Sequence, residues 1–187
     1  MDQRELVERA RGGEHDAFTS LVDLHLARLD AAARLILRDP ELARDAVQEA
    51  LIRAWRDLPG LRDPDRFDAW LHRLTVNACL DLVRRRKRRV IEVELTPLDS
   101  PSTHDVGGAL ADRQLLDQAL AGLAPSHRAV VALHYLLGMP LPEVAASLRI
   151  PIGTAKSRLH YALAAMRTTV TAEPETVPAT VAGGNLA

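Results

Sequence analysis

Aromatic residues and cysteine are scarce in this chain of 187 residues. Six residues are aromatic, and Val and Ile are sparse beside Ala, Leu and Arg, a mixture that fills helices better than strands. The single cysteine, Cys79, cannot form an internal disulfide or a cysteine-based zinc site, which is typical of a reducing compartment. These shortages predict an all-α protein.

Long hydrophobic runs are missing as well. The longest apolar-rich stretch, residues 129–141, is too short to cross a bilayer, and the N-terminus is charged where a signal peptide would be apolar. We therefore expect a cytoplasmic protein. With 47% hydrophobic residues, the chain can still bury a core and form one or two domains.

The sequence also lacks the common patterns of catalytic and metal sites. It contains no HExxH, CxxC, glycine-rich phosphate loop or GxSxG segment. Cys79 follows His72 by seven positions, which places the side chains about two helical turns apart, beyond contact of a nucleophile with its base. We expect no catalytic residue, no metal, no cofactor and a buried structural role for Cys79.

Charge is distributed unevenly although the net charge is only -1. Residues 61–89 carry nine basic and four acidic groups, and residues 126–167 carry five and one. Between them, residues 90–125 carry one basic and six acidic groups. Because polyanion binding depends on local positive charge, the two basic blocks are compatible with nucleic-acid binding.

Hydrophobic periodicity divides the chain into two groups of helices. The expected helices cover residues 3–11, 16–38, 40–58, 66–89, 110–123, 126–137, 141–148 and 152–166. The pattern stops in residues 90–108, where Pro, Ser, Gly and acidic residues accumulate, and again after residue 167. We predict two small helical domains, 1–89 and 109–167, joined by a flexible acidic linker, 90–108, and followed by a disordered tail, 168–187.

The last two expected helices have helix-turn-helix proportions, with a four-residue turn at 149–152. An apolar stripe through Ala155, Leu159 and Ala162 leaves a polar side that consists of Gly153, Thr154, Lys156, Ser157, Arg158 and His160. Small residues at the helix start allow close approach to a major groove, and the polar groups can donate to bases or phosphates. The alternative is a helical hairpin with a solvated polar face.

A second polar stripe runs along the fourth expected helix into the basic run 84–89. Its candidate DNA-binding residues are Asn77, Asp81, Arg84, Arg85 and Arg88. Six adjacent cations repel one another, and a phosphate backbone relieves that repulsion while releasing counterions. The run indicates nucleic acid without separating DNA from RNA.

A third pattern lies in the helix expected at 40–58. Asp45, Gln48, Glu49 and Ile52 occupy the side opposite its apolar residues. An Ile beside polar groups suits a partner protein better than water. By itself, however, the pattern favours a solvated helix face over a partner.

Three segments together resemble a known family. DPELARDAVQEALIRAW, FDAWLHRLTVNACLDLVRRRKRR and LPEVAASLRIPIGTAKSRLHYALAAMR are similar in order and spacing to bacterial RNA polymerase sigma factors of the extracytoplasmic-function group. The resemblance covers about residues 3–89 and 110–167. It implies that 1–89 is sigma domain two, which binds core polymerase and the minus-ten promoter element. It also implies that 109–167 is sigma domain four, which binds the minus-thirty-five element.

The resemblance also assigns roles to individual residues. Asp45, Gln48 and Glu49 match the polymerase-binding signature, and Ile52 lies beside them. The minus-ten helix is matched by Asn77, Asp81 and Arg84, and the loop 61–66 corresponds to one that captures a flipped base. The polar residues from Gly153 to His160 match the recognition helix. The chain departs from the family pattern at Pro140, where Ser or Thr is usual, and in residues 22–26, which lack the usual aromatics.

The sequence therefore predicts a promoter-specificity subunit without catalysis of its own. Its expected partners are core RNA polymerase, promoter DNA and, in some settings, an anti-sigma factor. The alternative is a sigma-like decoy that binds a regulatory protein without binding DNA. Such a decoy should lose its basic surfaces, whereas Lys156, Arg158 and the run 84–89 are all present.

Overall fold

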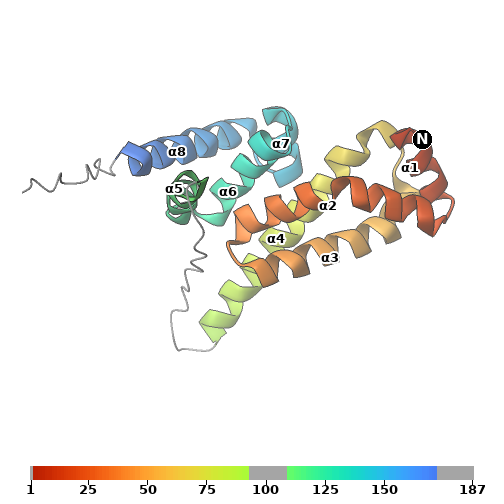
Figure 1. Cartoon of the computed structure of the whole chain (residues 1–187), viewed down its shortest axis with the longest axis horizontal. Coiled ribbons are helices and arrows are strands. Elements are labelled where there is room, and N and C mark those ends of the chain that lie inside the picture. Colours follow the sequence, from red (N-terminus) through yellow and green to blue (C-terminus); the bar gives the residue numbers. More distant parts are fainter. Residues whose placement is uncertain (1, 93–108, 172–187) are drawn as a thin grey trace, which may run out of the picture.

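The computed structural model describes residues 2–92 and 109–171, and it is all-α, as predicted (Figure 1). Within these residues there are eight α-helices and no strand. The N-terminal unit contains α1 (Gln3–Arg11), α2 (His15–Leu37), α3 (Pro40–Asp57), the 3-10 turns η1 (Leu58–Gly60) and η2 (Pro64–Arg66), and α4 (Phe67–Glu92). The C-terminal unit contains α5 (Ala109–Ala121), α6 (Pro125–Val131), the π-helical segment η3 (Ala132–Leu136), α7 (Leu141–Leu148) and α8 (Ile152–Thr171).

The turn between α2 and α3 follows from its residues. Arg38 adopts a left-handed conformation with φ of 56° and ends α2. Asp39 then caps α3: its Oδ1 accepts hydrogen bonds from the backbone N–H groups of Glu41 at 3.0 Å and Leu42 at 3.1 Å. Pro40 occupies the first turn of α3, where its missing N–H costs nothing. The two helices therefore form an antiparallel pair along the N-terminal unit.

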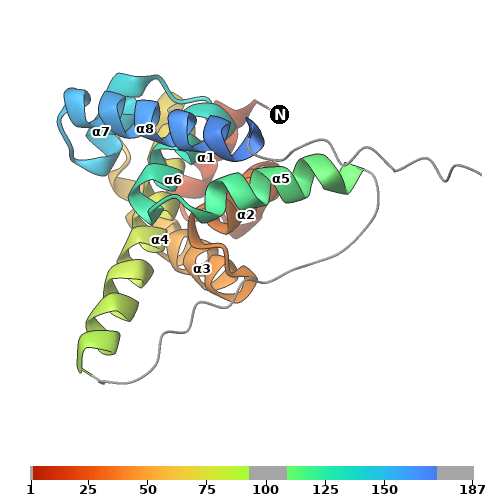
Figure 2. The ribbon, with the colours of Figure 1, turned by 90° about the vertical axis from the view of Figure 1, so that its left-hand side faces the viewer.

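Two helices are longer than predicted. α4 continues to Glu92, three residues into the expected linker 90–108, and it projects away from the rest of the N-terminal unit (Figure 2). Residues 90–92 contain neither Pro nor Gly, so nothing in them breaks the helix after the basic run. The remainder of the expected linker, residues 93–108, lies outside the described residues.

α8 likewise continues to Thr171, into the expected tail 168–187. Its threonine hydroxyls donate to the backbone of the preceding turn: Thr168 to the Ala164 carbonyl at 3.0 Å, and Thr171 to the Arg167 carbonyl at 2.9 Å. Residues 168–171 are therefore helical, and the prediction of disorder was wrong for them. The remainder of the tail lies outside the described residues.

One hydrophobic core cluster spans both units, and a second, smaller cluster of Leu120, Leu123, Val131 and Ala162 lies within the C-terminal unit. Buried residues of α2, α3 and α4 form a continuous cluster with Ala129, Val130 and Leu133 of the C-terminal unit. Arg128 of α6 is 8% exposed and crosses between the units. Its Nε donates to the Ile36 carbonyl of α2 at 2.8 Å, while Nη1 donates to the Leu123 carbonyl at 2.8 Å. This buried guanidinium satisfies a carbonyl in the last turn of α2 and another in the turn between α5 and α6.

Cys79 is buried in this core, as expected, and burial raises the pKa of its thiol to about 12. Within the described ranges, no group of three or more His, Cys, Asp and Glu residues could hold a metal ion. Over the same ranges, no helix has the length and apolar character needed to cross a membrane.

Candidate functional site

An open groove of about 970 Å³ runs between the outer faces of α2 and α3. Apolar side chains, including Leu26, Val47 and Leu51, line it, with Asp30 and Arg34 among its charged residues. Such a surface combines apolar contact area with charges of both signs and fits a partner protein.

The polymerase-binding residues predicted from the sequence lie on the exposed side of α3, and two of the four line this groove. All four, Asp45, Gln48, Glu49 and Ile52, are exposed on one side of α3, and Ile52 is 56% exposed. Gln48 and Ile52 line the groove itself. Ala43, Val47 and Ala54 are buried, as predicted, and Val47 also forms part of the groove lining.

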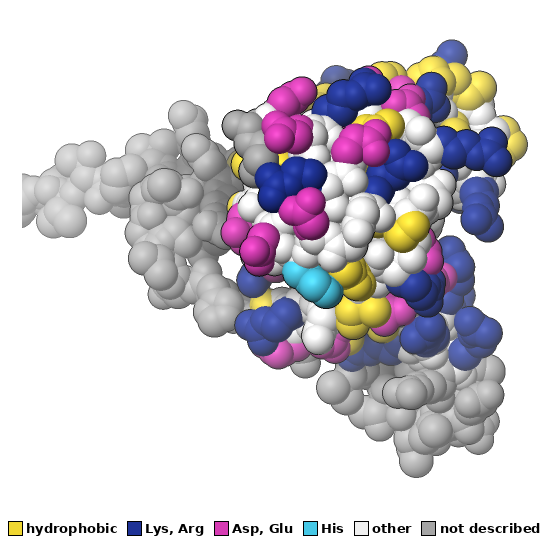
Figure 3. Space-filling view, turned by 90° about the vertical axis from the view of Figure 1, so that its right-hand side faces the viewer, with side chains coloured by type: hydrophobic (Ala, Val, Ile, Leu, Met, Phe, Trp, Pro, Cys, Tyr) yellow, Lys and Arg dark blue, Asp and Glu magenta, His cyan; other side chains and the backbone are white. Residues whose placement is uncertain are grey.

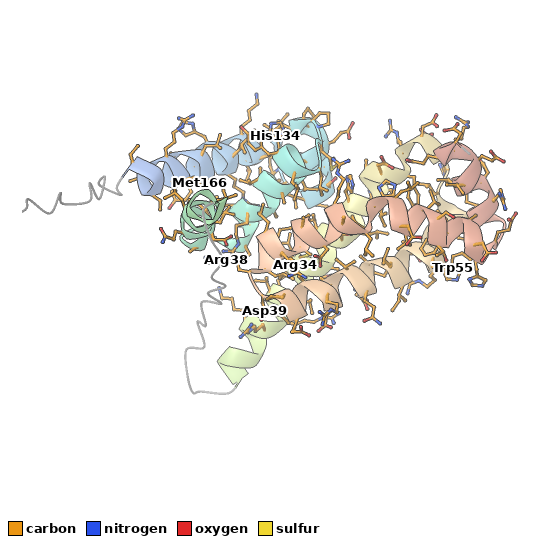
Figure 4. The ribbon with its side chains drawn as sticks, viewed as in Figure 1. Arg34, Arg38, Asp39, Trp55, His134 and Met166 are labelled. Atoms are coloured by element: carbon orange, nitrogen blue, oxygen red, sulfur yellow. The ribbon has the colours of Figure 1, made fainter. Side chains whose placement is uncertain are left out.

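An aromatic group that the sequence interpretation missed closes one end of the groove. The Trp55 ring lies 4.4 Å from the His15 ring, in a stacked arrangement, and 5.0 Å from the Phe18 ring. Trp55 lies far from the C-terminal unit, whereas Arg34, Arg38 and Asp39 lie at the other end of the α2–α3 pair (Figure 4). Figure 3 shows the Trp55 end of the molecule, where acidic and basic side chains are interspersed and histidine lies beside hydrophobic side chains. Helical periodicity could not reveal this group, because it depends on how α2 packs against α3.

The minus-ten candidates lie along α4, where it leaves the core. Arg84, Arg85 and Arg88 are exposed, whereas Asn77 and Asp81 are only partly exposed. The Asp81 carboxylate is engaged within the chain: Oδ1 accepts from Arg84 Nη1 at 2.8 Å, and Oδ2 lies 3.5 Å from Arg53 Nη1. Arg85 and Arg88 are therefore available to a polyanion, whereas Arg84 is paired with Asp81 of its own helix.

Arg53 of α3 is a second residue that the sequence interpretation missed. Its Nε donates to Glu49 Oε1 at 2.8 Å, so it stands between a polymerase-binding candidate and a DNA-binding candidate. The i,i+4 spacing of Glu49 and Arg53 was a readable signal for the first contact. The second contact crosses between helices and has no signature in the sequence.

The loop 61–66 is fixed by its own residues and by α1. Asp63 Oδ1 accepts from the Asp65 backbone N–H at 3.1 Å and thereby caps η2. Arg4 Nη1 of α1 lies 2.7 Å from Asp65 Oδ2, and buried Pro64 anchors the middle of the loop. Arg62 and Arg66 are exposed beside them.

The helix-turn-helix is present, with one correction. Ile152 belongs to α8, so the turn has three residues, 149–151, and not four. Arg149 ends α7 in a left-handed conformation with φ of 54°, and the next backbone N–H, that of Ile150, donates to the Ala145 carbonyl at 3.0 Å. The left-handed residue and this hydrogen bond together form the C-terminal cap of α7, which lets the chain turn tightly.

The recognition side of α8 points away from the core. Ala155 and Ala162 are fully buried. Four of the predicted recognition residues, Gly153, Lys156, Ser157 and His160, are exposed, and Thr154 and Arg158 are half-buried. All six lie on one helix, so the structure brings them together as predicted.

Two family models match the chain in the two units. Sigma-70 region 2 matches residues 21–89, and Sigma-70 region 4 matches residues 113–166. The first match covers most of the α2–α3 groove, from residue 21 onward, and the basic stripe of α4. The second match covers the helix-turn-helix.

Individual relatives agree with these matches. The chain is 36% identical over 167 residues to the ECF RNA polymerase sigma factor SigL of Mycobacterium tuberculosis, covering 88% of this chain and 94% of the relative. It is 37% identical over 155 residues to the RNA polymerase sigma-E factor of Streptomyces coelicolor, covering 83% and 86%.

Solved structures show the same fold. The sigma factor RpoE of Bartonella quintana, in complex with the anti-sigma factor NepR, superimposes with a TM-score of 0.73 at 25% identity, over 84% of this chain and 98% of that one. CnrH, in complex with the cytosolic domain of CnrY, gives a TM-score of 0.66 at 30% identity, over 92% and 99%. The fold and the matched regions define a sigma-70-type transcription factor. The chain belongs to the ECF family of RNA polymerase sigma factors.

Proposed function

We propose that three separate surfaces of the chain carry its three binding functions as a sigma factor. The α2–α3 groove, with Asp45, Gln48, Glu49 and Ile52, docks on core RNA polymerase. The exposed arginines of α4 bind the minus-ten element, and the polar side of α8 binds the minus-thirty-five element as duplex. The chain itself carries no catalytic activity and works in the cytoplasm.

The separation of the three surfaces supports this assignment. The groove combines apolar lining with charges of both signs, as a protein partner requires. The other two surfaces are basic and lie on different helices, α4 and α8, which suits two separate stretches of DNA. A decoy that binds only a regulatory protein has no use for two exposed basic surfaces.

Regulatory partners of the anti-sigma class belong to the same proposal. NepR and the cytosolic domain of CnrY are bound to the two solved relatives. We extend this class of partner to the present chain because it shares their fold over most of its length.

Transcription in vitro with core polymerase tests the proposal. The purified chain is added to core enzyme on a pool of random promoters, and the transcripts are sequenced. We expect enrichment of templates with two short conserved elements at a fixed separation. Absence of enrichment, with the chain still bound to core enzyme, would refute promoter recognition. Failure to bind core enzyme would refute the role of the groove.

A further inference from the structure

Four charged side chains form a chain of ion pairs from Glu49 on the exposed side of α3 to Arg84 on α4. Glu49 Oε1 accepts from Arg53 Nε at 2.8 Å, Arg53 Nη1 lies 3.5 Å from Asp81 Oδ2, and Asp81 Oδ1 accepts from Arg84 Nη1 at 2.8 Å. The two middle residues are the least exposed, with side chains 23% exposed at Arg53 and 33% at Asp81. The end residues, Glu49 and Arg84, face solvent at 48% and 61%.

The contacts in this chain are unequal. Both end contacts are hydrogen-bonded pairs at 2.8 Å, whereas the middle contact, between α3 and α4, is longer at 3.5 Å. Arg53 thus gives its closer contact to Glu49, and Asp81 gives its closer contact to Arg84. In this arrangement the Arg84 guanidinium is partly neutralised by a carboxylate of its own helix.

We propose that Arg53 is a positioning residue that couples polymerase docking at Glu49 to DNA binding at Arg84. When a cation of the polymerase takes Glu49, Arg53 loses its closer partner and pairs more fully with Asp81. Asp81 then holds Arg84 less strongly, and Arg84 becomes available to a phosphate. The inference rests on the proposed roles of Glu49 and Arg84, and it reassigns Asp81 from a DNA contact to a switchable partner of two arginines.

Electrostatics favours this order of events. A carboxylate at Asp81 is repelled by a phosphate backbone unless a cation compensates it, and Arg53 is the cation within reach from the neighbouring helix. The planar guanidinium presents separate donors, so one side chain can hold Glu49 through Nε and approach Asp81 through Nη1. Because the middle pair is shielded more than the ends, its contact is screened less by salt.

Epistasis in DNA binding tests the coupling. The full chain without polymerase is titrated with fluorescent single-stranded DNA at low salt. Glu49→Gln should tighten binding about two- to five-fold, because it frees Arg53 as polymerase would, and Arg53→Met should weaken binding by a similar factor. The double variant should bind like Arg53→Met, because Glu49 acts on DNA only through Arg53.

Matched controls separate this coupling from a plain change of charge. Glu41→Gln removes a carboxylate from the same helix, where Glu41 pairs with Arg44 and not with α4. Arg56→Met removes an arginine that pairs with its neighbour Asp57. Both should change affinity by less than the matching substitution at Glu49 or Arg53. Circular dichroism of each variant confirms that helicity is retained.

Two outcomes would overturn the inference. One is additive behaviour, in which the double variant binds like the wild type because the two charge changes cancel. The other is an effect of Glu41→Gln as large as that of Glu49→Gln. Failure of the proposed function looks different: the wild-type chain with core polymerase would select no promoter from the random pool, whatever the free chain's epistasis.

Discussion

His72 shows what burial does to a single titratable residue. It is 3% exposed in α4, its ring lies 6.4 Å from that of His25 of α2, and its Nε2 has no hydrogen-bond partner. Loss of hydration lowers the pKa of His72 to about 4, although Asp68 acts in the opposite direction. The pKa of His25 is lowered for the same principal reason. Both imidazoles are therefore harder to protonate in the folded chain than in the unfolded chain.

This burial predicts a loss of stability in mild acid. Below the ordinary pKa of 6.5 the unfolded chain gains a proton at His72, whereas the folded chain does not until about pH 4. The free energy of unfolding should therefore fall as pH drops through this window, by about 2 kcal/mol from His72 between pH 7 and pH 5. Urea unfolding at pH 7 and at pH 5 measures this decrease in the free energy of unfolding.

The variant His72→Leu isolates the contribution. It keeps an apolar side chain of similar bulk and removes the titrating group, so its stability should depend less on pH than that of the wild type over the same window. An identical decrease in both proteins would show that His72 is not the cause.

At the scale of helices, the boundaries set by local chemistry could be predicted and those set by packing could not. Asp39-Pro40 correctly predicted the start of α3, because a cap and a first-turn proline act within a few residues. The end of α4 was placed three residues too early, since it was set where the hydrophobic period stops, and the helix continues beyond that point to Glu92. The π-helical η3 was not foreseen at all, because its bond from Leu137 N–H to the Ala132 carbonyl forms in a segment packed on α2.

The candidate functional residues divide in the same way, into those that the sequence predicts and those that depend on packing. Exposed residues on one helical face, such as Gln48 and Ile52 or Lys156 and His160, could be read from periodicity. The Arg53–Asp81 pair and the Trp55 group could not, since each joins residues of different helices. Such contacts need the three-dimensional arrangement.

The exposed side of α3 carries a prediction about polymerase affinity. Replacing Asp45 and Gln48 together by Ala should weaken binding to core polymerase by a few kcal/mol at most, because contacts are lost without creating a cavity. Co-purification with core enzyme and circular dichroism measure affinity and fold. Unchanged affinity at unchanged helicity would remove these residues from the docking surface.

The two basic helices, α4 and α8, should differ in which part of the DNA they recognise. Lys156, Ser157 and His160 are expected to influence which duplex bases are preferred, whereas Arg88 supplies phosphate attraction. Arg88→Ala should therefore reduce the salt dependence of DNA binding by roughly one phosphate contact and leave the preferred sequence intact. Selection from random DNA at two salt concentrations tests both. A changed base preference for Arg88→Ala, with none for Lys156→Ala, would reverse the roles.

For the whole molecule, the contact between the two units decides how promoter spacing is set. Arg128 donates to the Ile36 carbonyl, and Arg28 Nη2 donates to the Leu136 carbonyl at 3.1 Å, so both tie the C-terminal unit to α2. While these contacts hold, the separation of α4 and α8 is fixed. Once they open, the reach of the chain between α4 and α5 becomes the limit.

The maximum length of this connecting segment can be compared with the length of a DNA duplex. Helix α4 ends at Glu92 and α5 begins at Ala109, so residues 93–108, sixteen in number, connect them. Fully extended, they cover roughly 50 Å at about 3.3 Å per residue, the length of about 15 base pairs at roughly 3.4 Å each. The acidic residues Glu94, Asp99 and Asp105 would be repelled by DNA, so we expect this segment to pass along the polymerase and the polymerase to set the spacing.

Changing the length of this segment tests that view. Inserting four Gly and Ser residues near Ser100 should leave the preferred spacer unchanged, because added length costs little once the span can be bridged. Deleting about eight residues should abolish transcription from two-part promoters. The measurement is transcription from templates whose spacer varies one base pair at a time. If the optimal spacer length moves with segment length, the segment and not the polymerase sets the promoter spacing. Full activity after the deletion would mean that the two units stay packed together on the promoter.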